Sequence, residues 1–398
     1  MSTINLKGRI PSPIHIHGKI GKALPTFTVT FKDGNTVLPQ TQVKQGKTAT
    51  YNGTVPAKDG NAFLGWVLSE PSNDIVDTDT FGGTIYQQIT NVTEDITCWA
   101  VYSDKRIIHD SWDVISQRSQ AGTANNYYHV GDMKKIHVQG NILEFSSPYV
   151  QYPFTIDKDF YVCILGINHN SAIEGSGITF GCFKDAESFE DKSIIHFSSY
   201  NKNTTPDMFV MSAYPSYNNI GGWRESYMRY NVLGSTDTAP DGAGAGTNAT
   251  STCATNPVAN TLLSCFPQDL RAVMKPIVKY TDNAGNKSNI ESNVTVTTDY
   301  LPLLSEFEVF GERKYANEYE QSYQQQYEYF AIGNRSVKFN YQNTNPVIWW
   351  LRSPTYNRDD LFNCVSYETE MGSYKGGDGV VSIAQASNSL GLSPIFKV

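Results

Sequence analysis

The sequence predicts a β-rich α+β protein, and three observations carry the prediction. Aromatic residues make up 12% of the chain while charged residues make up only 18%. Short apolar runs alternate with turn residues along most of the length, and few stretches have helical spacing. A disordered chain of 398 residues would carry fewer aromatic and more charged residues. We therefore expect two or three ordered domains, each with its own core.

The cysteines indicate neither a metal centre nor a disulfide framework. All six stand singly in the sequence, with no Cys-x-x-Cys pair. Structural zinc needs clustered ligands, so we expect no metal, and no motif indicates a cofactor. Buried free thiols suit a protein made in a reducing cytoplasm.

Charge and hydropathy limit the classes of partner that the protein is expected to have. The net charge is −8 and no cluster of Lys and Arg is present, so nucleic acid is not an expected partner. No run approaches the roughly 20 apolar residues of a membrane span, and the N-terminus has no signal-peptide pattern. We expect no membrane insertion and no secretion by the usual route.

Residues 1–25 form the first of three predicted regions. Ile4, Leu6, Ile14 and Ile16 alternate with polar residues, interrupted by Gly and Pro, which predicts two short strands. So short a segment cannot build a core of its own. We expect it to attach the protein to other chains or to mediate oligomerisation.

Residues 26–103 read as a small β module. The strand 27–31 is followed by a Lys-Asp-Gly-Asn turn, then Phe63-Leu64-Gly65-Trp66, and the strand 96–102 closes the unit. In this order the motifs resemble a single internalin-type B-repeat. The resemblance implies a β-grasp-like spacer or protein-contact module without catalysis, with Trp66 and Trp99 in its core.

Residues 104–398 are predicted to form one large α+β domain. A helix is expected to begin at Trp112, and the continuous apolar run 160–167 predicts a fully buried strand. Helical spacing of apolar residues predicts a helix over 260–279. The Gly, Ala, Thr, Asn and Asp-rich stretch 236–260 is expected to be a flexible insertion within this domain.

The stretch 347–354 organises this domain. Trp349 and Trp350 are adjacent within an apolar run, and consecutive side chains of a strand point to opposite faces. At least one indole must therefore enter a core. Pro354 cannot continue the hydrogen-bond ladder, so the strand is expected to end there.

Six motifs in order give the large domain a family resemblance. They are Trp112, Val130-Gly131-Asp132, the Ile164–His169 run, Gly221-Gly222-Trp223 with Arg229, Leu303–Gly311, and Trp-Trp-Leu-Arg-Ser-Pro. They resemble a domain of unknown function with a WWLRSP signature, found in gut Firmicutes and their bacteriophages. The family implies no established enzyme activity, and the last third also resembles the C-type-lectin-like fold. We take as structural signature residues Trp223, Arg229, Glu306, Trp349, Trp350 and Arg352.

Catalytic chemistry has little support in the sequence. Glu306 and Glu308 lie two residues apart and Asp359 and Asp360 are adjacent, but neither spacing defines an acid pair, so solvated or hydrogen-bonded carboxylates are expected. His169 follows a buried strand and is interpreted as a satisfied core histidine, with a general base as the alternative. We predict no catalytic residue. Arg352 is predicted to pair with a buried acid such as Glu306.

The segment 315–330 leaves two interpretations open. Tyr319, Tyr323 and Tyr327 stand among Gln and Glu, which suits an exposed surface for sugar stacking or protein contacts. Their spacing of four also suits a helix that packs the three rings inward.

Three functional classes compete. A bacteriophage virion structural protein, such as a tail or head fibre or a decoration protein, accounts for the surface-type modules, the free thiols and the N-terminal β segment. Its partners would be other virion proteins, through residues 1–25, and a host-surface protein or glycan. A homo-oligomer is expected, with a trimer as the guess for a fibre. The alternatives are a bacterial cell-surface adhesin and a glycan-active enzyme.

Overall fold

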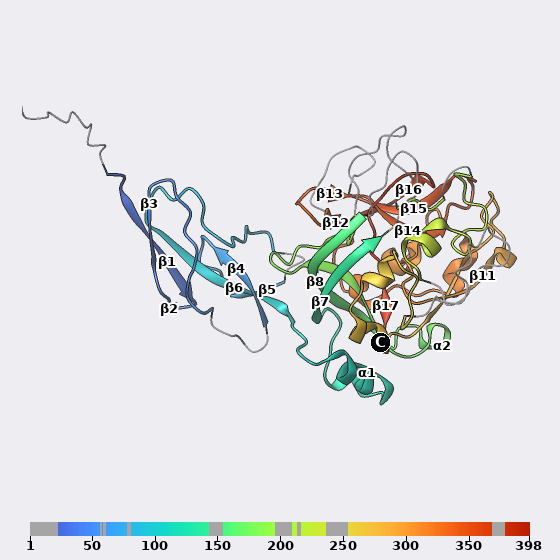
Figure 1. Ribbon diagram of the computed structural model, residues 1–398, viewed down its shortest axis with the longest axis horizontal. Helices are drawn as coiled ribbons and strands as arrows, with labels where there is room; N and C mark the ends of the chain where they lie inside the picture. The colour runs from blue at the N-terminus through green and yellow to red at the C-terminus, as the bar shows by residue number, and fades with distance from the viewer. Residues whose placement is uncertain are drawn as a thin grey trace, which may run out of the picture.

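The computed structural model describes residues 23–55, 58, 61–77, 81–142, 154–195, 209–212, 216–235, 254–367 and 379–398. Figure 1 shows a slender N-terminal module beside a larger, rounder body. The structure is strand-rich with few, short helices, which confirms the predicted β-rich α+β class. The predicted attachment segment 1–25 lies almost entirely outside the described residues, as does the insertion between 236 and 253.

The slender module is built on one mixed sheet. Strand β6 (Ile96–Arg106) lies at its centre, parallel to β1 (Thr26–Asp33) and antiparallel to β4 (Asn61–Val67). Around them are β2 (Thr36–Val37), β3 (Thr41–Lys44) and β5 (Ile75–Val76), which pair with β1, β1 and β6. Gly34, with φ of +55°, makes the predicted hairpin turn between β1 and β2.

The core of this module is aromatic. Phe31 packs edge-on against Trp66 with ring centroids 4.6 Å apart, and Phe63 contacts both Trp66 and Tyr102. Trp66 is buried, as predicted. The prediction for Trp99 is wrong in part, because this indole is only half-buried. Cys98 and Ala100 enter this core, so strand alternation turns Trp99 to the other face of the sheet.

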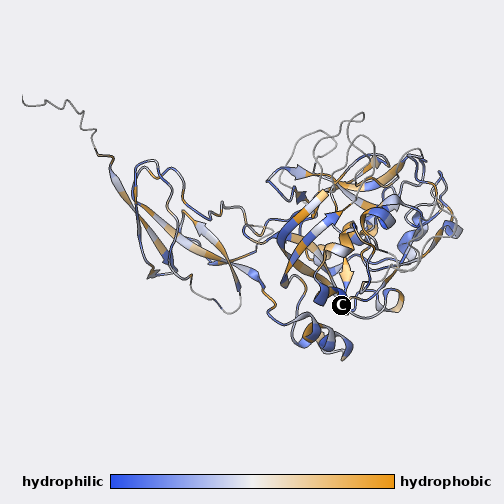
Figure 2. Cartoon of the chain, in the orientation of Figure 1, coloured by the Kyte–Doolittle hydropathy of each residue, from blue (hydrophilic) through white to orange (hydrophobic). Residues whose placement is uncertain are grey.

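The large body contains a four-stranded antiparallel sheet in the order β17-β9-β8-β7. Its strands are β7 (Met133–Ile142), β8 (Phe154–Ile167), β9 (Ile178–Asp185) and β17 (Phe396–Lys397). The run 160–167 lies in β8 and is buried except at its half-buried Tyr161 and Ile167, so the predicted strand is confirmed. Figure 2 shows the apolar residues concentrated on the strands of both bodies.

Helix α1 (Trp112–Gln120) packs beside this sheet and begins where predicted. Ser111 caps it by accepting a hydrogen bond from the backbone N–H of Val114 at 3.3 Å. The Trp112 ring packs edge-on against Phe180 and Phe396, at 5.2 and 5.9 Å. The first helix of the large body is thereby fixed to strands from the middle and the end of the chain.

The tryptophan pair lies on β14 (Trp349–Pro354), next to β15 (Leu361–Ser366) and β16 (Val380–Gln385) in an antiparallel sheet. Both indoles are 0% exposed, and they enter two different hydrophobic clusters, as opposite faces of one strand require. Trp349 Nε1 donates to the Ser336 carbonyl and Trp350 Nε1 to the Phe209 carbonyl, each at 2.9 Å. Strand β14 ends at Pro354, as predicted.

The predicted helix over 260–279 is wrong. The segment instead forms the 3-10 turn η3 (Leu262–Cys265), the short helix α3 (Gln268–Val273) and the strand β10 (Ile277–Asp282). Pro267 stands in an extended conformation before α3, and Pro276 disfavours helix at Lys275. The same apolar residues are therefore divided among a 3-10 turn, a short helix and a strand.

The remaining elements of the large body are short. Strand β11 (Val294–Asp299) forms an antiparallel hairpin with β10. The other elements are η1 (Ala124–Asn126), α2 (Ser171–Glu174), the π-helical turn η2 (Met228–Val232), η4 (Glu291–Asn293), α4 (Glu306–Phe310), η5 (Glu318–Ser322), α5 (Glu328–Ala331), β12 (Lys338–Phe339) and β13 (Pro346–Val347). Within the described ranges, no helix has the length and apolar character needed to cross a membrane.

Candidate functional site

Glu308 is the centre of a buried ionic network in the large body. Its segment, Ser-Glu-Phe-Glu, forms a capping box at the start of α4. Ser305 Oγ accepts from the Glu308 N–H at 3.2 Å, and Glu308 Oε2 accepts from the Ser305 N–H at 2.9 Å. The cap turns the Glu308 carboxylate away from solvent and toward β14.

Arg352, on β14, binds Glu308 with both ends of its guanidinium. Nη2 donates to Oε1 at 2.9 Å, Nη1 donates to Oε2, and both side chains are 0% exposed. Arg352 also donates to Thr281 Oγ1 at 2.7 Å and to the Leu303 carbonyl at 3.0 Å. Burial alone would raise the pKa of Glu308, but the charges of Arg352 and Lys279 outweigh it and hold the pKa well below its usual range.

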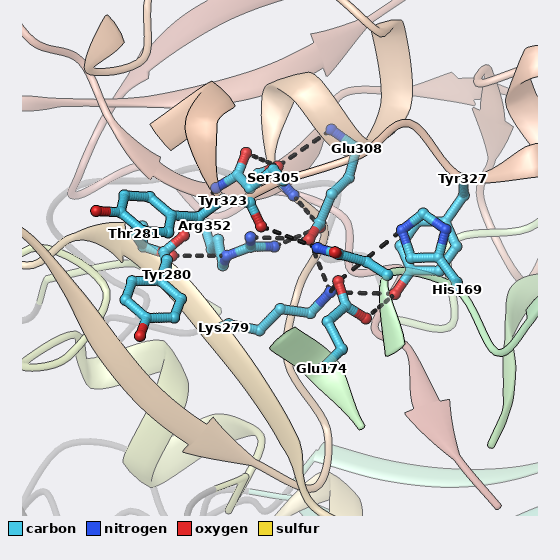
Figure 3. Close-up of polar contacts among 12 residues, drawn as sticks. His169, Glu174, Lys279, Tyr280, Thr281, Ser305, Glu308, Tyr323, Tyr327 and Arg352 are labelled. Atoms are coloured by element: carbon cyan, nitrogen blue, oxygen red, sulfur yellow. Dashed lines mark hydrogen bonds and ion pairs between the residues drawn. The ribbon is translucent and has the colours of Figure 1, made fainter. Parts of the chain in front are cut away.

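Lys279, on β10, joins this pair to a second carboxylate (Figure 3). Its Nζ donates to Glu308 Oε1 at 2.7 Å and to Glu174 Oε1 at 2.8 Å. Tyr327, next to α5, donates its hydroxyl to Glu174 Oε2 at 3.0 Å, so both carboxylate oxygens of Glu174 accept a hydrogen bond. Lys397 Nζ donates to the carbonyls of Glu174 and Gly175, and burial lowers the pKa of Lys397 to about 8. The network thus joins segments that are far apart in the sequence.

The predicted pairing of Arg352 with Glu306 is wrong, because Arg352 binds Glu308. Two residues apart at the start of a helix, the two side chains point in different directions. Glu306 instead accepts from the backbone N–H groups of 314–316 and from Asn363 Nδ2 at 2.8 Å. Burial raises the pKa of Glu306 although these donors favour the charged form. Glu306 therefore holds a loop and a neighbouring strand.

Glu320 is a third buried carboxylate nearby. It accepts from the Asp282 N–H at 2.8 Å, from Ser353 Oγ at 2.6 Å and from Gln324 Nε2 at 3.0 Å. No cation is among these partners, and burial raises its pKa to about 7. Nothing in the sequence identified Glu320, because its partners come from three separate segments.

The signature residues Trp223 and Arg229 meet at Asp299. Trp223 Nε1 donates to Asp299 Oδ2 at 2.9 Å, and Arg229 Nε donates to Oδ1 at 2.6 Å. Ser235 and Thr297 add hydroxyl donors at 3.1 and 2.9 Å. Asp299 is 0% exposed, so this second network is also enclosed. All six signature residues are buried, as Trp223, Arg229, Glu306, Trp349, Trp350 and Arg352 are each at most 3% exposed.

The three tyrosines do not act as one surface. Tyr327 is 0% exposed and belongs to the ionic network, so its prediction as a surface-contact residue is wrong. Tyr323 is half-buried and stacks on Tyr280 with centroids 4.4 Å apart, and Tyr319 is half-buried as well. The inward-packing helix is also not formed, because η5 and α5 are separate short turns with Asn317 as the cap of η5. Tyr319 and Tyr323 stay candidates for a contact surface.

His169 lies in the core, as interpreted from the sequence. Its ring stacks on Tyr327 at 3.8 Å, and Nε2 is 3.9 Å from Glu174 Oε1. Nε2 is buried without a hydrogen-bond partner among the described residues, so the expectation of a satisfied histidine is not met. Burial lowers the pKa of His169, which favours the neutral ring.

Apart from His169, the acidic and basic groups of this site are hydrogen-bonded to protein groups. Each of Glu174, Glu306, Glu308, Glu320 and Asp299 accepts at least two hydrogen bonds from protein groups. Such bonds join elements of the fold and fix their orientation. Five of the six cysteines lie within the described residues, where all five are buried and none forms a disulfide: Cys98, Cys163, Cys182, Cys265 and Cys364.

Comparison with known proteins gives one family match. A family model described as a domain of unknown function (DUF6273) matches residues 219–398. The matched segment contains the signature residues, Glu308 and the tryptophan pair, but not Glu174 or His169. No curated protein and no solved structure matches the chain.

Proposed function

We propose that the protein is a bacteriophage virion structural protein, a fibre or decoration protein of the tail or head. Its large body would present a non-catalytic surface to a host-surface protein or glycan. The observation that carries this proposal is the buried network around Glu308. Its acids and bases, the groups that catalysis would need exposed, are bonded to one another inside the body.

The network favours a display role for a physical reason. Buried ion pairs add little net stability over well-packed apolar residues, but they fix one arrangement of the segments that carry them. Here they join α2, β10, α4 and β14, which are distant in sequence. Loops that are carried by a rigid body do not have to be ordered when a partner binds, so less of the binding free energy is lost.

The N-terminal segment and the large body are expected to have different partners. Residues 1–25 attach the protein to other virion proteins or to sister copies, and the assembly is a homo-oligomer, with a trimer as the working expectation. The large body faces the host, with the half-buried Tyr319 and Tyr323 as candidate contact residues. In the sequence, the slender module lies between this segment and the large body.

Deletion of residues 1–25 tests the attachment. The deleted protein is expected to be soluble and folded but absent from purified particles when it is produced in place of the full chain. A matched control replaces residues 1–25 with a Gly/Ser-rich segment of equal length, which keeps the spacing and removes the alternating apolar residues. Normal incorporation of either variant would contradict the proposed attachment.

A further inference from the structure

The slender module has a cavity that is separate from the networks of the large body. Its volume is about 210 Å³, and it is open to solvent on one side. Its lining comes from three places in the sheet: the β1–β2 turn at Gly34, the loop 70–74 between β4 and β5, and Trp99 on β6. Three separate segments therefore converge on a single indole.

Trp99 forms the apolar wall of this cavity. In the sheet it is flanked by Lys32 on β1 and Val67 on β4, and its ring is half-buried on the face opposite the aromatic core. Lys32 Nζ lies 5.7 Å from the ring centroid, so a cation is already placed against the indole. That contact disfavours a cationic ligand, which would have to compete with Lys32.

The rim of the cavity is polar, and its two charged residues, Glu70 and Asp74, are both acidic. Glu70 and Asn73 are exposed on the loop, and Glu70 has no ion pair or hydrogen bond with any described residue. Asn73 Oδ1 accepts from the Ile75 N–H at 3.1 Å, which orients the amide and leaves its NH₂ as a donor. Asp74 is already paired with Lys58, so Glu70 supplies the acceptor and Asn73 the donor.

We propose that this cavity binds one neutral pyranose ring of a carbohydrate. A pyranose has a face of C–H groups that packs on an indole, and a rim of hydroxyl groups that both donate and accept hydrogen bonds. Trp99 matches the face, and Glu70 and Asn73 match the rim. The volume is below the roughly 300–1,000 Å³ of pockets that enclose drug-sized ligands, which suits a single ring.

The site goes beyond the proposed function, since it lies in the slender module and does not depend on a role in a virion. It would give the chain a carbohydrate contact independent of the surface that carries Tyr319 and Tyr323. Normal incorporation of the variants that lack residues 1–25 would contradict the proposed attachment but not carbohydrate binding by the cavity. Absence of carbohydrate binding would likewise leave the proposed attachment standing.

The test is saturation-transfer NMR and titration of the full chain with methyl glycosides of glucose, galactose and N-acetylglucosamine. At least one is expected to bind with a Kd on the order of 1 mM, as suits a ligand of this size. Trp99→Ala is expected to weaken that binding by about tenfold, because the stacking wall is lost. Tyr127→Ala removes an aromatic side chain, 47% exposed, from the large body and is expected to change nothing.

Glu70→Ala and Asn73→Ala keep the test decisive if Trp99→Ala disturbs the module. Both side chains are exposed, so the variants are expected to fold normally while each weakens glycoside binding several-fold. Choline and methyl glucuronide serve as cationic and anionic probes. The proposal is overturned if no neutral glycoside binds, if binding is unchanged in both Trp99→Ala and Glu70→Ala, or if a charged probe binds more tightly than every neutral one.

Discussion

Removal of the Arg352 guanidinium is the most direct perturbation of the buried network. Arg352→Ala deletes two hydrogen bonds to Glu308 and one each to Thr281 and the Leu303 carbonyl. Among the described residues, Lys279 would then be the only cation left in contact with the Glu308 carboxylate, which is 0% exposed. Breaking a buried pair from one side costs about 3–5 kcal/mol. Because Lys279 stays in place, we expect a loss near the lower end, about 3 kcal/mol.

Urea unfolding followed by tryptophan fluorescence measures this loss. Trp66 and Trp99 lie in the slender module and the other four tryptophans in the large body. The two bodies share one buried hydrophobic cluster, so the unfolding midpoint reports on both together. Arg358→Ala is the matched control, because Arg358 pairs with Asp360 at the surface and its side chain is 52% exposed. Exposed pairs contribute about 0–1 kcal/mol, so its midpoint should hardly move.

A double-mutant cycle identifies the partner of Arg352. Arg352→Met combined with Glu308→Gln is expected to give a coupling free energy above about 1 kcal/mol, because the two side chains share two hydrogen bonds. Arg352→Met combined with Glu306→Gln should be additive within about 0.5 kcal/mol. An unchanged unfolding midpoint in Arg352→Ala, or coupling to Glu306 instead of Glu308, would refute the account of the network.

Three further predictions concern other parts of the large body. Glu320 holds its proton up to about pH 7 in the folded state and releases it near pH 4.5 when unfolded, so its contribution to stability falls as pH rises between these values. The free energy of unfolding should fall by about 3 kcal/mol over this pH range in the unmodified protein, and this fall should be absent in Glu320→Gln. The same pH dependence of unfolding in both proteins would contradict the raised pKa of Glu320. Asp299→Ala removes the carboxylate that binds the buried Arg229, and it is expected to lower the free energy of unfolding in urea by about 3–5 kcal/mol. A loss below about 1 kcal/mol would contradict a structural role for this ion pair. Tyr319→Ala is expected to cost about 1 kcal/mol of stability, because its ring is half-buried, and to reduce binding of the full chain to host cells. Unaltered binding would exclude Tyr319 from the contact surface.

Local patterns predicted the parts of the fold that depend on local interactions. The alternation of side chains along a strand was enough to place Trp349 and Trp350 in two cores, and continuity of apolar residues was enough for the strand at 160–167. The prediction of a helix over 260–279 failed because it followed apolar spacing past Pro267 and Pro276. Helix α3 ends at Val273, and the backbone is already extended at Met274.

The partners within the site were less predictable. The capping box Ser-x-x-Glu was a usable signal that Glu308, rather than Glu306, folds back over the start of α4. Glu174 and Asp299 carried no such signal, because their cationic partners Lys279 and Arg229 lie 105 and 70 residues away and are brought close only by the packing of the sheets. Tyr327 was misplaced for the same reason, since its hydroxyl meets Lys279 and Glu174 across the core.

Immunolabelling of purified particles shows whether the protein is part of the virion. Particles purified from producing cells are labelled with an antibody raised against residues 112–398 and viewed by negative-stain electron microscopy. Label is expected at defined positions on the tail or head of intact particles. Label confined to the surface of bacterial cells, with none on the particles, would contradict it.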